Sequence, residues 1–262
     1  MSQIKVLVHG AAGRVGQEVI KAVCQEKDMS LVGAVDIKCS GNTLTLTDGS
    51  TVPFSASLKH IIDSCNPDVM VDFSVARASM PALRIAAKQN VNMVIGTTGF
   101  TADELKEMQK LAEANEVGIV AAPNFALGAV LMIHLAKIAG KYIDHAEIIE
   151  LHHDKKLDAP SGTSLLTAKA MAEARGKPFL PPAAGEHTPS RGQTVEGIDI
   201  HSVRLPGLMA HQEVIFGTAG QTLSIRHDTI NRECYMPGVL LAIRAVVKKK
   251  GFIYGLDKLL GL

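Results

Sequence analysis

The feature that most constrains this chain is a glycine-rich turn placed directly after its first apolar segment. Residues 4–9 (IKVLVH) have the apolar pattern of a buried strand, and the turn GAAGRVG follows at once. A helical pattern comes next, with Val15, Val19 and Val23 on one stripe. This order is a variant of the dinucleotide fingerprint, in which glycines let the backbone approach a pyrophosphate at the start of a helix. The residues predicted to bind this part of a cofactor are Gly10, Ala11, Ala12, Gly13, Arg14, Val15 and Gly16.

An acidic residue ends the second apolar run and bears on the choice of cofactor. Asp36 follows Gly16 by about 20 residues, where a carboxylate usually binds the ribose hydroxyls of the adenosine. This charge would repel a 2′-phosphate, whereas Arg14 and Lys38 would attract one. We therefore expect NADH to be favoured and NADPH to be tolerated. The alternative is a tight turn without a ligand, in which Asp36 only caps its strand.

The first half of the chain alternates apolar runs with helical patterns. Further strand-like runs cover residues 68–74, 91–99 and 117–125, and helical patterns at residues 76–90 and 101–116 separate them. Thr101 and Glu104 have the spacing of a capping box at the start of the second of these helices. Such alternation predicts an α/β fold with a Rossmann-type, doubly wound parallel sheet.

The second half has a different texture. Alternating or β-rich runs cover residues 145–153, 196–205, 211–218 and 221–228, with Thr-Ala-Gly as a hairpin-like break between the last two. They predict a second α+β domain with a mostly antiparallel sheet. A final helical pattern from residue 236 is expected to end at Gly251 as its cap and to return to the first domain. The predicted domains are 1–124 completed by 235–262, which binds the dinucleotide, and 125–234, which binds the substrate.

Composition excludes several classes of partner. Lys and Arg number 27 against 26 Asp and Glu, so no strong net charge attracts nucleic acid or a membrane surface. The apolar segment 125–140 is interrupted by His134 and Lys137 and is too short for a bilayer, so a core helix is expected. The four cysteines are irregularly spaced, which argues against a zinc site or a disulfide framework. Without a leader-like N-terminus, we expect a cytoplasmic protein.

A cluster of polar residues at 150–164 (ELHHDKKLDAPSGTS) has the composition of a catalytic site. In a strand, His152 and His153 would point to opposite faces, so they should have different roles. A helix is predicted after Pro160, with Ser161 or Thr163 as its N-cap. The N–H groups of Ser161, Gly162 and Thr163, together with Lys155 or Lys156, could bind a carboxylate of a small dianionic substrate.

The same cluster could supply a proton. Hydride addition to an electron-poor double bond leaves an anion, and a histidine is a natural proton donor near neutral pH. The alternative is that each of these residues is structural, as most polar residues near turns are. The other histidines are expected to be structural or solvated; they are His9, His60, His134, His145, His187, His201, His211 and His227.

Several strings in this sequence together resemble one family. They are GAAGRVG, VDFS, GTTGF, APNFALG, HHDKKLDAPSGT, SVRLPGLMAHQEVIFG and RHDTINRECYMPGVLLAIR, and they span almost the full length in order. The chain resembles the bacterial 4-hydroxy-tetrahydrodipicolinate (dihydrodipicolinate) reductases, nicotinamide-dependent enzymes of the diaminopimelate route to lysine. The resemblance implies a site in the cleft between two domains that close on each other, a small dicarboxylate substrate and a homotetramer.

The resemblance also implies roles for individual residues. His152 would be the proton donor and Lys156 its catalytic partner, while His153, Lys156, Gly162 and Thr163 would hold the substrate carboxylates. The residues implied at the nicotinamide end of the cofactor are Phe73, Gly96, Thr97, Thr98, Ala122, Pro123, Asn124 and Phe125. Ile37 stands where some relatives have an arginine suited to a 2′-phosphate, a role that Lys38 could partly take. Two rival hypotheses are another two-domain NAD(P)-dependent dehydrogenase and a non-catalytic dinucleotide sensor.

Overall fold

The computed structural model describes residues 2–181 and 188–262, and His187 lies outside the described residues. The chain divides into two compact units, which are Met1–Leu127 with Arg232–Leu262, and Gly128–Asn231. Boundaries predicted from the sequence, after residues 124 and 234, lie close to these divisions. Because the C-terminal segment belongs to the first unit, the second unit is one continuous stretch of chain inserted into the first.

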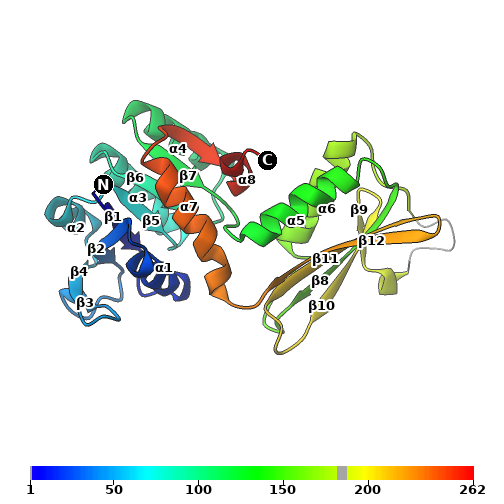
Figure 1. Ribbon diagram of the computed structural model, residues 1–262, viewed down its shortest axis with the longest axis horizontal. Helices are drawn as coiled ribbons and strands as arrows, with labels where there is room; N and C mark the ends of the chain where they lie inside the picture. Colours follow the sequence, from blue (N-terminus) through cyan, green and yellow to red (C-terminus); the bar gives the residue numbers. More distant parts are fainter. Residues whose placement is uncertain (1, 182–187) are drawn as a thin grey trace. The chain divides into compact units, whose positions relative to one another are not determined.

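The first unit contains an eight-stranded sheet in the order β13-β7-β6-β5-β1-β2-β4-β3 (Figure 1). Every neighbouring pair is parallel except β3 with β4. All residues of β5, β6 and β7 are buried, which explains why their sequence runs are almost continuously apolar. The strands are β1 (Ile4–His9), β2 (Met29–Val35), β3 (Thr43–Thr45), β4 (Thr51–Ser55), β5 (Val69–Asp72), β6 (Asn92–Ile95), β7 (Gly118–Ala121) and β13 (Gly251–Tyr254).

Helices cover this sheet on both faces, as predicted for a doubly wound fold. One face packs against α2, α3 and α4 through a core that includes Leu83, Met93 and Met108. On the other face α1 contacts α7, and α7 contacts β5, β6 and β7. The predicted capping box of Thr101 and Glu104 is present at the start of α4. The helices are α1 (Arg14–Gln25), α2 (Leu58–Cys65), α3 (Ala76–Lys88), α4 (Ala102–Ala114), α7 (Met236–Val246) and α8 (Leu256–Leu260), with a short 3-10 helix η2 (Arg232–Tyr235) before α7.

The prediction that Gly251 caps the last long helix is wrong. Helix α7 ends at Val246, and Gly251 begins β13, where its N–H donates to the Val117 carbonyl at 3.0 Å. A glycine after a basic run resembles a helix cap, but its positive φ of 97° here turns the chain into a strand that pairs with β7. The β3–β4 hairpin was also missed, because its strands are short; in β4 only Val52 and Phe54 are buried.

The second unit is built on a five-stranded sheet in the order β12-β11-β8-β10-β9. Strands β8 and β10 are parallel and the other pairs are antiparallel, which confirms the predicted mostly antiparallel sheet. The strands are β8 (His145–His152), β9 (Gln193–Val195), β10 (Ile198–Arg204), β11 (Ala210–Thr218) and β12 (Gln221–Thr229), and a 3-10 helix η1 (Pro189–Arg191) precedes β9.

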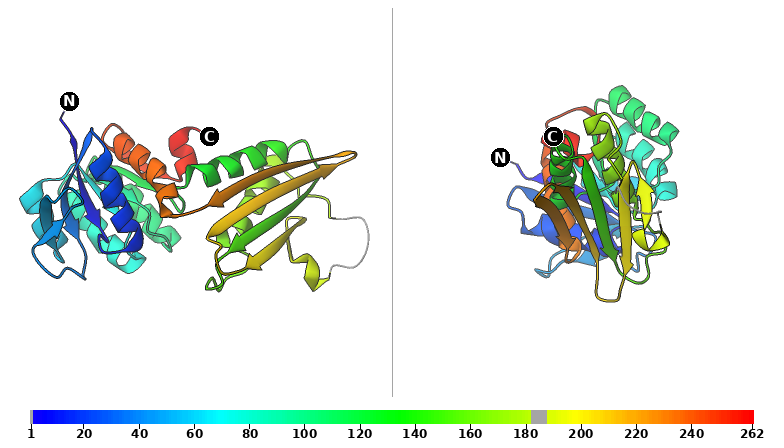
Figure 2. Two further views of the ribbon diagram at one scale, coloured as in Figure 1. Left: turned by 60° about the horizontal axis from the view of Figure 1, so that its bottom comes forward. Right: turned by 90° about the vertical axis from the view of Figure 1, so that its right-hand side faces the viewer.

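Two helices, α5 (Leu127–Ala139) and α6 (Gly162–Arg175), lie on one face of this sheet (Figure 2). The core between them and the sheet includes Ala136, Met171, Phe179 and Phe216. The expectation that α5 is a core helix holds for only one of its sides, because Leu131, Leu135 and Ile138 are 44%, 49% and 44% exposed. In the part of the chain that the structure describes, no helix has the length and apolar character needed to cross a membrane.

Candidate active site

The glycine turn in the first unit is shaped by close backbone contacts. Gly10 has a φ of 82°, and a Cβ on it would lie 2.7 Å from the Phe73 carbonyl oxygen. A Cβ on Gly16 would lie 2.2 Å from the carbonyl oxygen of Gly10. No side chain caps α1 at Gly13, and the first turn carries no acidic residue. The start of α1 therefore keeps backbone N–H groups and a positive helix end available for an anion such as a phosphate.

Asp36 fastens this turn to the end of β2. One carboxylate oxygen accepts the Ala12 N–H at 3.0 Å, and the other accepts the Lys38 N–H at 2.9 Å. The capping role considered for Asp36 is therefore real, and its charge lies beside the turn that is proposed to bind phosphate. Ile37 is 88% exposed, and the Arg14 and Lys38 side chains are exposed as well.

The predicted nicotinamide-end residues lie at the carboxyl ends of β5, β6 and β7. A Cβ on Gly96 would lie 2.0 Å from the Phe73 ring, so only glycine lets this ring pack there. The rings of Phe73 and Phe125 pack with their centroids 5.9 Å apart. Ligands of doubly wound sheets bind at this edge.

Exposure divides these predicted residues into three groups, of which Phe73, Gly96 and Asn124 are partly exposed. Thr98 and Pro123 are exposed and could touch a ligand, whereas Thr97, Ala122 and Phe125 are buried and could only support one. The Thr97 hydroxyl donates to the Asp72 carboxylate at 3.2 Å, and Asn124 accepts the Ala126 N–H at 2.9 Å.

Asp72 is a buried carboxylate beneath this edge that the sequence analysis missed. It is 0% exposed, pairs with Nδ1 of His9 at 2.9 Å, and accepts hydrogen bonds from the Ser74 N–H and the Ser79 hydroxyl. Burial would raise the pKa of Asp72, but the hydrogen bonds and the charge of His9 outweigh burial and lower it. An aspartate that closes an apolar strand run was the available signal.

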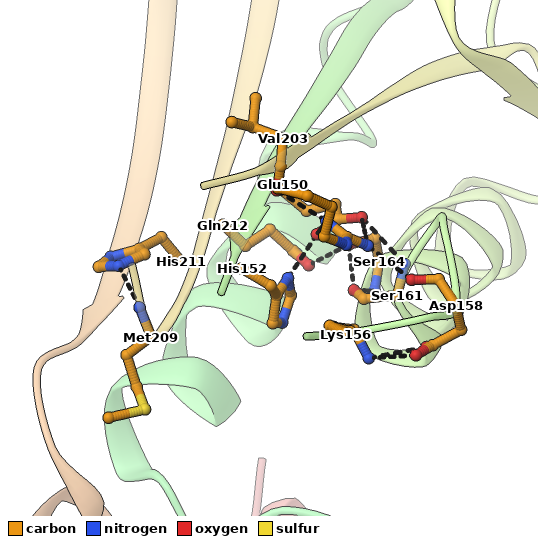
Figure 3. Close-up of polar contacts among 11 residues, drawn as sticks. Glu150, His152, Lys156, Asp158, Ser161, Ser164, Val203, Met209, His211 and Gln212 are labelled. Atoms are coloured by element: carbon orange, nitrogen blue, oxygen red, sulfur yellow. Dashed lines mark hydrogen bonds and ion pairs between the residues drawn. The ribbon is translucent and has the colours of Figure 1, made fainter. Parts of the chain in front are cut away.

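In the second unit, the candidate catalytic cluster begins at the end of β8. Glu150 is 0% exposed and lies with Ile148 on the core face of β8. Its polar contacts are shown in Figure 3. It accepts hydrogen bonds from Nδ1 of His152 at 2.5 Å and from the Arg204 guanidinium at 2.7 and 2.9 Å. Burial would raise the pKa of Glu150, but the hydrogen bonds from His152 and Arg204 prevail and hold the pKa at about 2.

The two lysines and the second histidine lie in the loop after β8. Lys156 donates to both carboxylate oxygens of Asp158 at 2.7 Å (Figure 3). His153 and Lys155 are exposed, so they are free to approach a ligand. His152, the last residue of β8, contacts Glu150, whereas His153 lies in the loop, so the two adjacent histidines have different surroundings because the strand ends between them.

The start of α6 shows how the predicted anion site is built. Ser161 is the N-cap, with its Oγ accepting the Ser164 N–H at 3.2 Å, and its own N–H donates to Glu150 at 3.2 Å. Both polar groups of Ser161 therefore have protein partners, so its predicted contact with substrate finds no support here. A Cβ on Gly162 would meet no atom within 4 Å, which leaves this helix end open beside Thr163.

Buried polar contacts fasten α6 to the sheet. The Ser164 hydroxyl donates to the Gln212 side chain at 2.9 Å, and the Gln212 amide donates to Thr167 at 2.9 Å. Glu150, Arg204 and Gln212 were not predicted as parts of the site. The signal for Glu150 and Gln212 was a polar residue on the apolar face of a strand, and Arg204 had no comparable signal. Among the described residues, no group of three His, Cys, Asp or Glu side chains could hold a metal ion.

Comparison with known proteins gives one consistent result. The family described as "Dihydrodipicolinate reductase, N-terminus" matches residues 4–125, and "Dihydrodipicolinate reductase, C-terminus" matches residues 128–260. The 4-hydroxy-tetrahydrodipicolinate reductase of Dehalococcoides mccartyi is 60% identical over 100% of both chains. The enzyme of the same name from Moorella thermoacetica is 49% identical over 99% of both chains.

Solved structures agree with this result. A dipicolinate-bound dihydrodipicolinate reductase from Paenisporosarcina sp. TG-14 matches with a TM-score of 0.86 and 41% identity, covering 98% of this chain and 99% of that one. An amine dehydrogenase from Mycobacterium smegmatis shares the fold with a TM-score of 0.67 at 14% identity, covering 98% of this chain and 96% of that one. From the family matches and the full-length identity, this chain belongs to the dihydrodipicolinate reductase family.

Proposed function

We propose that this chain reduces dihydrodipicolinate, formed from 4-hydroxy-tetrahydrodipicolinate by loss of water, to tetrahydrodipicolinate in the diaminopimelate route to lysine. The observation that carries the proposal is that one buried carboxylate, Glu150, contacts both His152 and the start of α6. The contacts of Glu150 therefore fix the candidate proton donor and the candidate anion site relative to each other. This is the arrangement that hydride addition to an unsaturated dicarboxylate needs.

The substrate is held by its carboxylates. The N–H groups of Gly162 and Thr163 at the start of α6, with Lys156 and His153 from the preceding loop, bind these anions. Lys156 has three ammonium protons, so it can keep its ion pair with Asp158 and still donate to a ligand. The Paenisporosarcina reductase binds dipicolinate, a planar dicarboxylate, and this supports the same substrate class for the present chain.

The cofactor is a nicotinamide dinucleotide, which supplies hydride when bound. Its pyrophosphate fits the start of α1, where Gly10 and Gly16 leave no room for a Cβ and no side chain caps the helix. Thr98 and Pro123 are the exposed residues at the nicotinamide end. The charge of Asp36 favours NADH, while Arg14 and Lys38 allow NADPH.

The residues of the chain then handle the proton. When hydride adds to the conjugated ring, an electron pair moves onto the ring, and the His152 imidazolium donates its proton there. The carboxylate of Glu150 stabilises the imidazolium before transfer. Lys156, in the loop after β8, is a second cation, and its charge balances the negative charge of the substrate.

A homotetramer is supported by the second sheet. Its face opposite α5 and α6 carries Ile149, Leu151 and Ile215, which are only partly buried and which no helix covers in the described part of the unit. This open face suits sheet-to-sheet association between copies. The irregular spacing of the four cysteines fits a reducing cytoplasm.

A coupled assay with freshly made substrate tests the function. Nicotinamide absorbance should fall with NADH, and with NADPH to a lesser extent, only when substrate is present. Substrate-dependent oxidation of neither cofactor would refute the proposal.

Two variants separate the reductase from the rival hypotheses. His152→Ala and Lys156→Ala should each lower kcat by about 100-fold or more with nearly unchanged NADH binding, because general acid catalysis contributes a factor of about 10² to 10⁴. A dinucleotide sensor would be indifferent to both changes. A dehydrogenase of another specificity would turn over other substrates and leave this one unreduced.

A further inference from the structure

Glu150 is bound by donors from three separate segments of the second unit. His152 comes from the same strand and the Ser161 N–H from the start of α6 (Figure 3). Arg204 comes from the end of β10. The carboxylate is 0% exposed, and the His152 side chain is 15% exposed. The contacts of Glu150 therefore connect the candidate proton donor to the start of α6.

The contact with Glu150 determines which ring nitrogen of His152 is free for proton transfer. Because a carboxylate only accepts hydrogen bonds, the His152 Nδ1 that lies 2.5 Å from it must carry a proton. A neutral ring then has its lone pair on Nε2, and a protonated ring has its transferable proton there. The contact also fixes the plane of the ring.

Arg204 secures this arrangement. Its guanidinium holds both oxygens of Glu150 and also donates to the Asp158 carbonyl at 2.6 Å, in the loop that carries Lys156. With Arg204 on both oxygens, the carboxylate cannot rotate away from His152 without breaking two charge-assisted bonds.

Resting on the function proposed above, we propose that Glu150, held by Arg204, is a positioning residue that fixes His152 with Nδ1 protonated, so that only Nε2 delivers the proton. The same carboxylate, through the Ser161 N–H, sets the place of the proton donor relative to the N–H groups of Gly162 and Thr163 that bind the substrate. A buried carboxylate with a purely structural role would stabilise the sheet but would leave the histidine tautomer and kcat independent of its charge.

Glu150→Gln tests the proposal because it keeps the shape of the side chain and removes its charge. Oε1 accepts from Arg204 and from the Ser161 N–H, whereas Oε2 accepts from Arg204 and from His152, and of these donors only the histidine can become an acceptor. The amide oxygen of the variant should therefore take the Oε1 position, and its NH2 group should face His152 at the loss of one Arg204 hydrogen bond. Nδ1 would then have to accept a hydrogen bond, and the neutral ring should change to the Nε2–H tautomer. The ring ¹⁵N shifts of His152, assigned by comparison with His152→Ala, report this change directly.

Kinetics provide the second measurement. We expect kcat of Glu150→Gln to fall about 100-fold, while KM for the dicarboxylate changes much less and NADH affinity is unchanged. Glu173→Gln, which removes an exposed carboxylate from α6, is the matched control and should retain normal kcat and the wild-type tautomer. If Glu150→Gln does not fold, Arg204→Lys replaces it and should lower kcat while a smaller part of the histidine population changes tautomer.

The outcomes separate this inference from the proposed function. An unchanged His152 tautomer with unchanged kcat in Glu150→Gln would overturn the positioning role and leave the reductase intact. A wild-type protein without reductase turnover would refute the function, while the tautomer measurement would still decide whether Glu150 fixes the ring. For Arg204→Lys, wild-type kcat and tautomer would likewise contradict the role of Arg204.

Discussion

At the residue scale, the two units use the same device at the end of a strand. In the first unit Asp72 pairs with Nδ1 of His9, and in the second Glu150 pairs with Nδ1 of His152. Both carboxylates are fully buried, and in both the hydrogen bonds outweigh burial and lower the pKa. Burying an ionised carboxylate costs free energy unless the carboxylate has a partner. Each carboxylate is therefore stabilised by its histidine, and the same contact holds the histidine ring in place.

The pKa of Glu150 predicts a specific dependence of stability on pH. Folding lowers this pKa from 4.5 to about 2, so the ionised carboxylate stabilises the folded protein above pH 4.5. That contribution, on the order of 3 kcal/mol, is lost as the pH falls from about 4.5 to 2. Urea unfolding of the wild type and of Glu150→Gln should show the gap between them shrinking over this window. A gap that does not depend on pH would contradict the shift.

A second residue-scale prediction concerns Asp36 and the cofactor. Asp36→Ser removes the charge that would repel a 2′-phosphate, and Arg14 and Lys38 remain exposed nearby. The ratio of kcat/KM for NADPH over NADH should rise by about tenfold, a change of about 1.4 kcal/mol. Because Asp36 also accepts the Ala12 N–H, NADH binding itself should weaken. Lys38→Ala is the complementary control and should shift the ratio toward NADH. If neither variant changed the NADPH to NADH ratio of kcat/KM, the 2′-phosphate would not lie beside Asp36 and Lys38.

At the element scale, α6 depends on contacts with the sheet for the place of its first turn. Its N-cap is Ser161 and its C-cap is Gly176 in the left-handed conformation, so both ends are set by local sequence. The side chains of Ser164 and Thr167 nevertheless meet Gln212 on β11 in the buried core. Capping determines where the helix begins along the chain, and Gln212 determines where that beginning lies in space.

Gln212→Leu should therefore loosen the start of α6. The substitution leaves the Ser164 and Thr167 hydroxyls without this partner in a buried place, which should cost about 1–3 kcal/mol of unfolding free energy. KM for the dicarboxylate should rise more than kcat falls, because the N–H groups of Gly162 and Thr163 bind the substrate. Urea titration and steady-state kinetics measure the two effects. Gln221→Leu, at an exposed position on β12, is the control, and equal effects in both variants would rule out this role.

At the scale of the whole molecule, two apolar surfaces of the second unit differ in character. The open face of the sheet carries Ile149, Leu151 and Ile215 among ion pairs such as Arg226 with Glu213. Helix α5 carries the exposed stripe of Leu131, Leu135 and Ile138. On the sheet face apolar side chains alternate with paired charged ones, whereas the described residues of the α5 stripe are apolar.

The proposed tetramer can be tested through that difference. Ile149→Lys should shift the assembly toward smaller species in sedimentation velocity, because a lysine at the centre of the face would lose hydration on association. Leu131→Lys, on the α5 stripe, should leave the assembly unchanged. Dissociation by Leu131→Lys alone would show that the copies meet through the helix.

The sequence by itself determined the features that depend on neighbours along the chain. The glycine turn with its following helix, the capping box at Thr101 and the Ser161 cap each depend on a few consecutive residues. The hydrophobic periodicity of the two halves of the chain distinguished a parallel sheet that is buried on both faces from a sheet that helices cover on one face. The predicted function came from the sequence motifs that resemble the reductase family and span almost the full length of the chain.

Only the tertiary structure decided which distant residues share a contact. Glu150 contacts Arg204, which is 54 residues away, and Ser164 contacts Gln212, which is 48 residues away. The segment that begins at Gly251 forms a strand because it pairs with β7. A buried polar side chain must find a partner, yet its sequence neighbours do not say which one, because burial and pairing depend on how strands and helices come together. Local sequence therefore placed the histidine, and folding supplied the carboxylate that orients it.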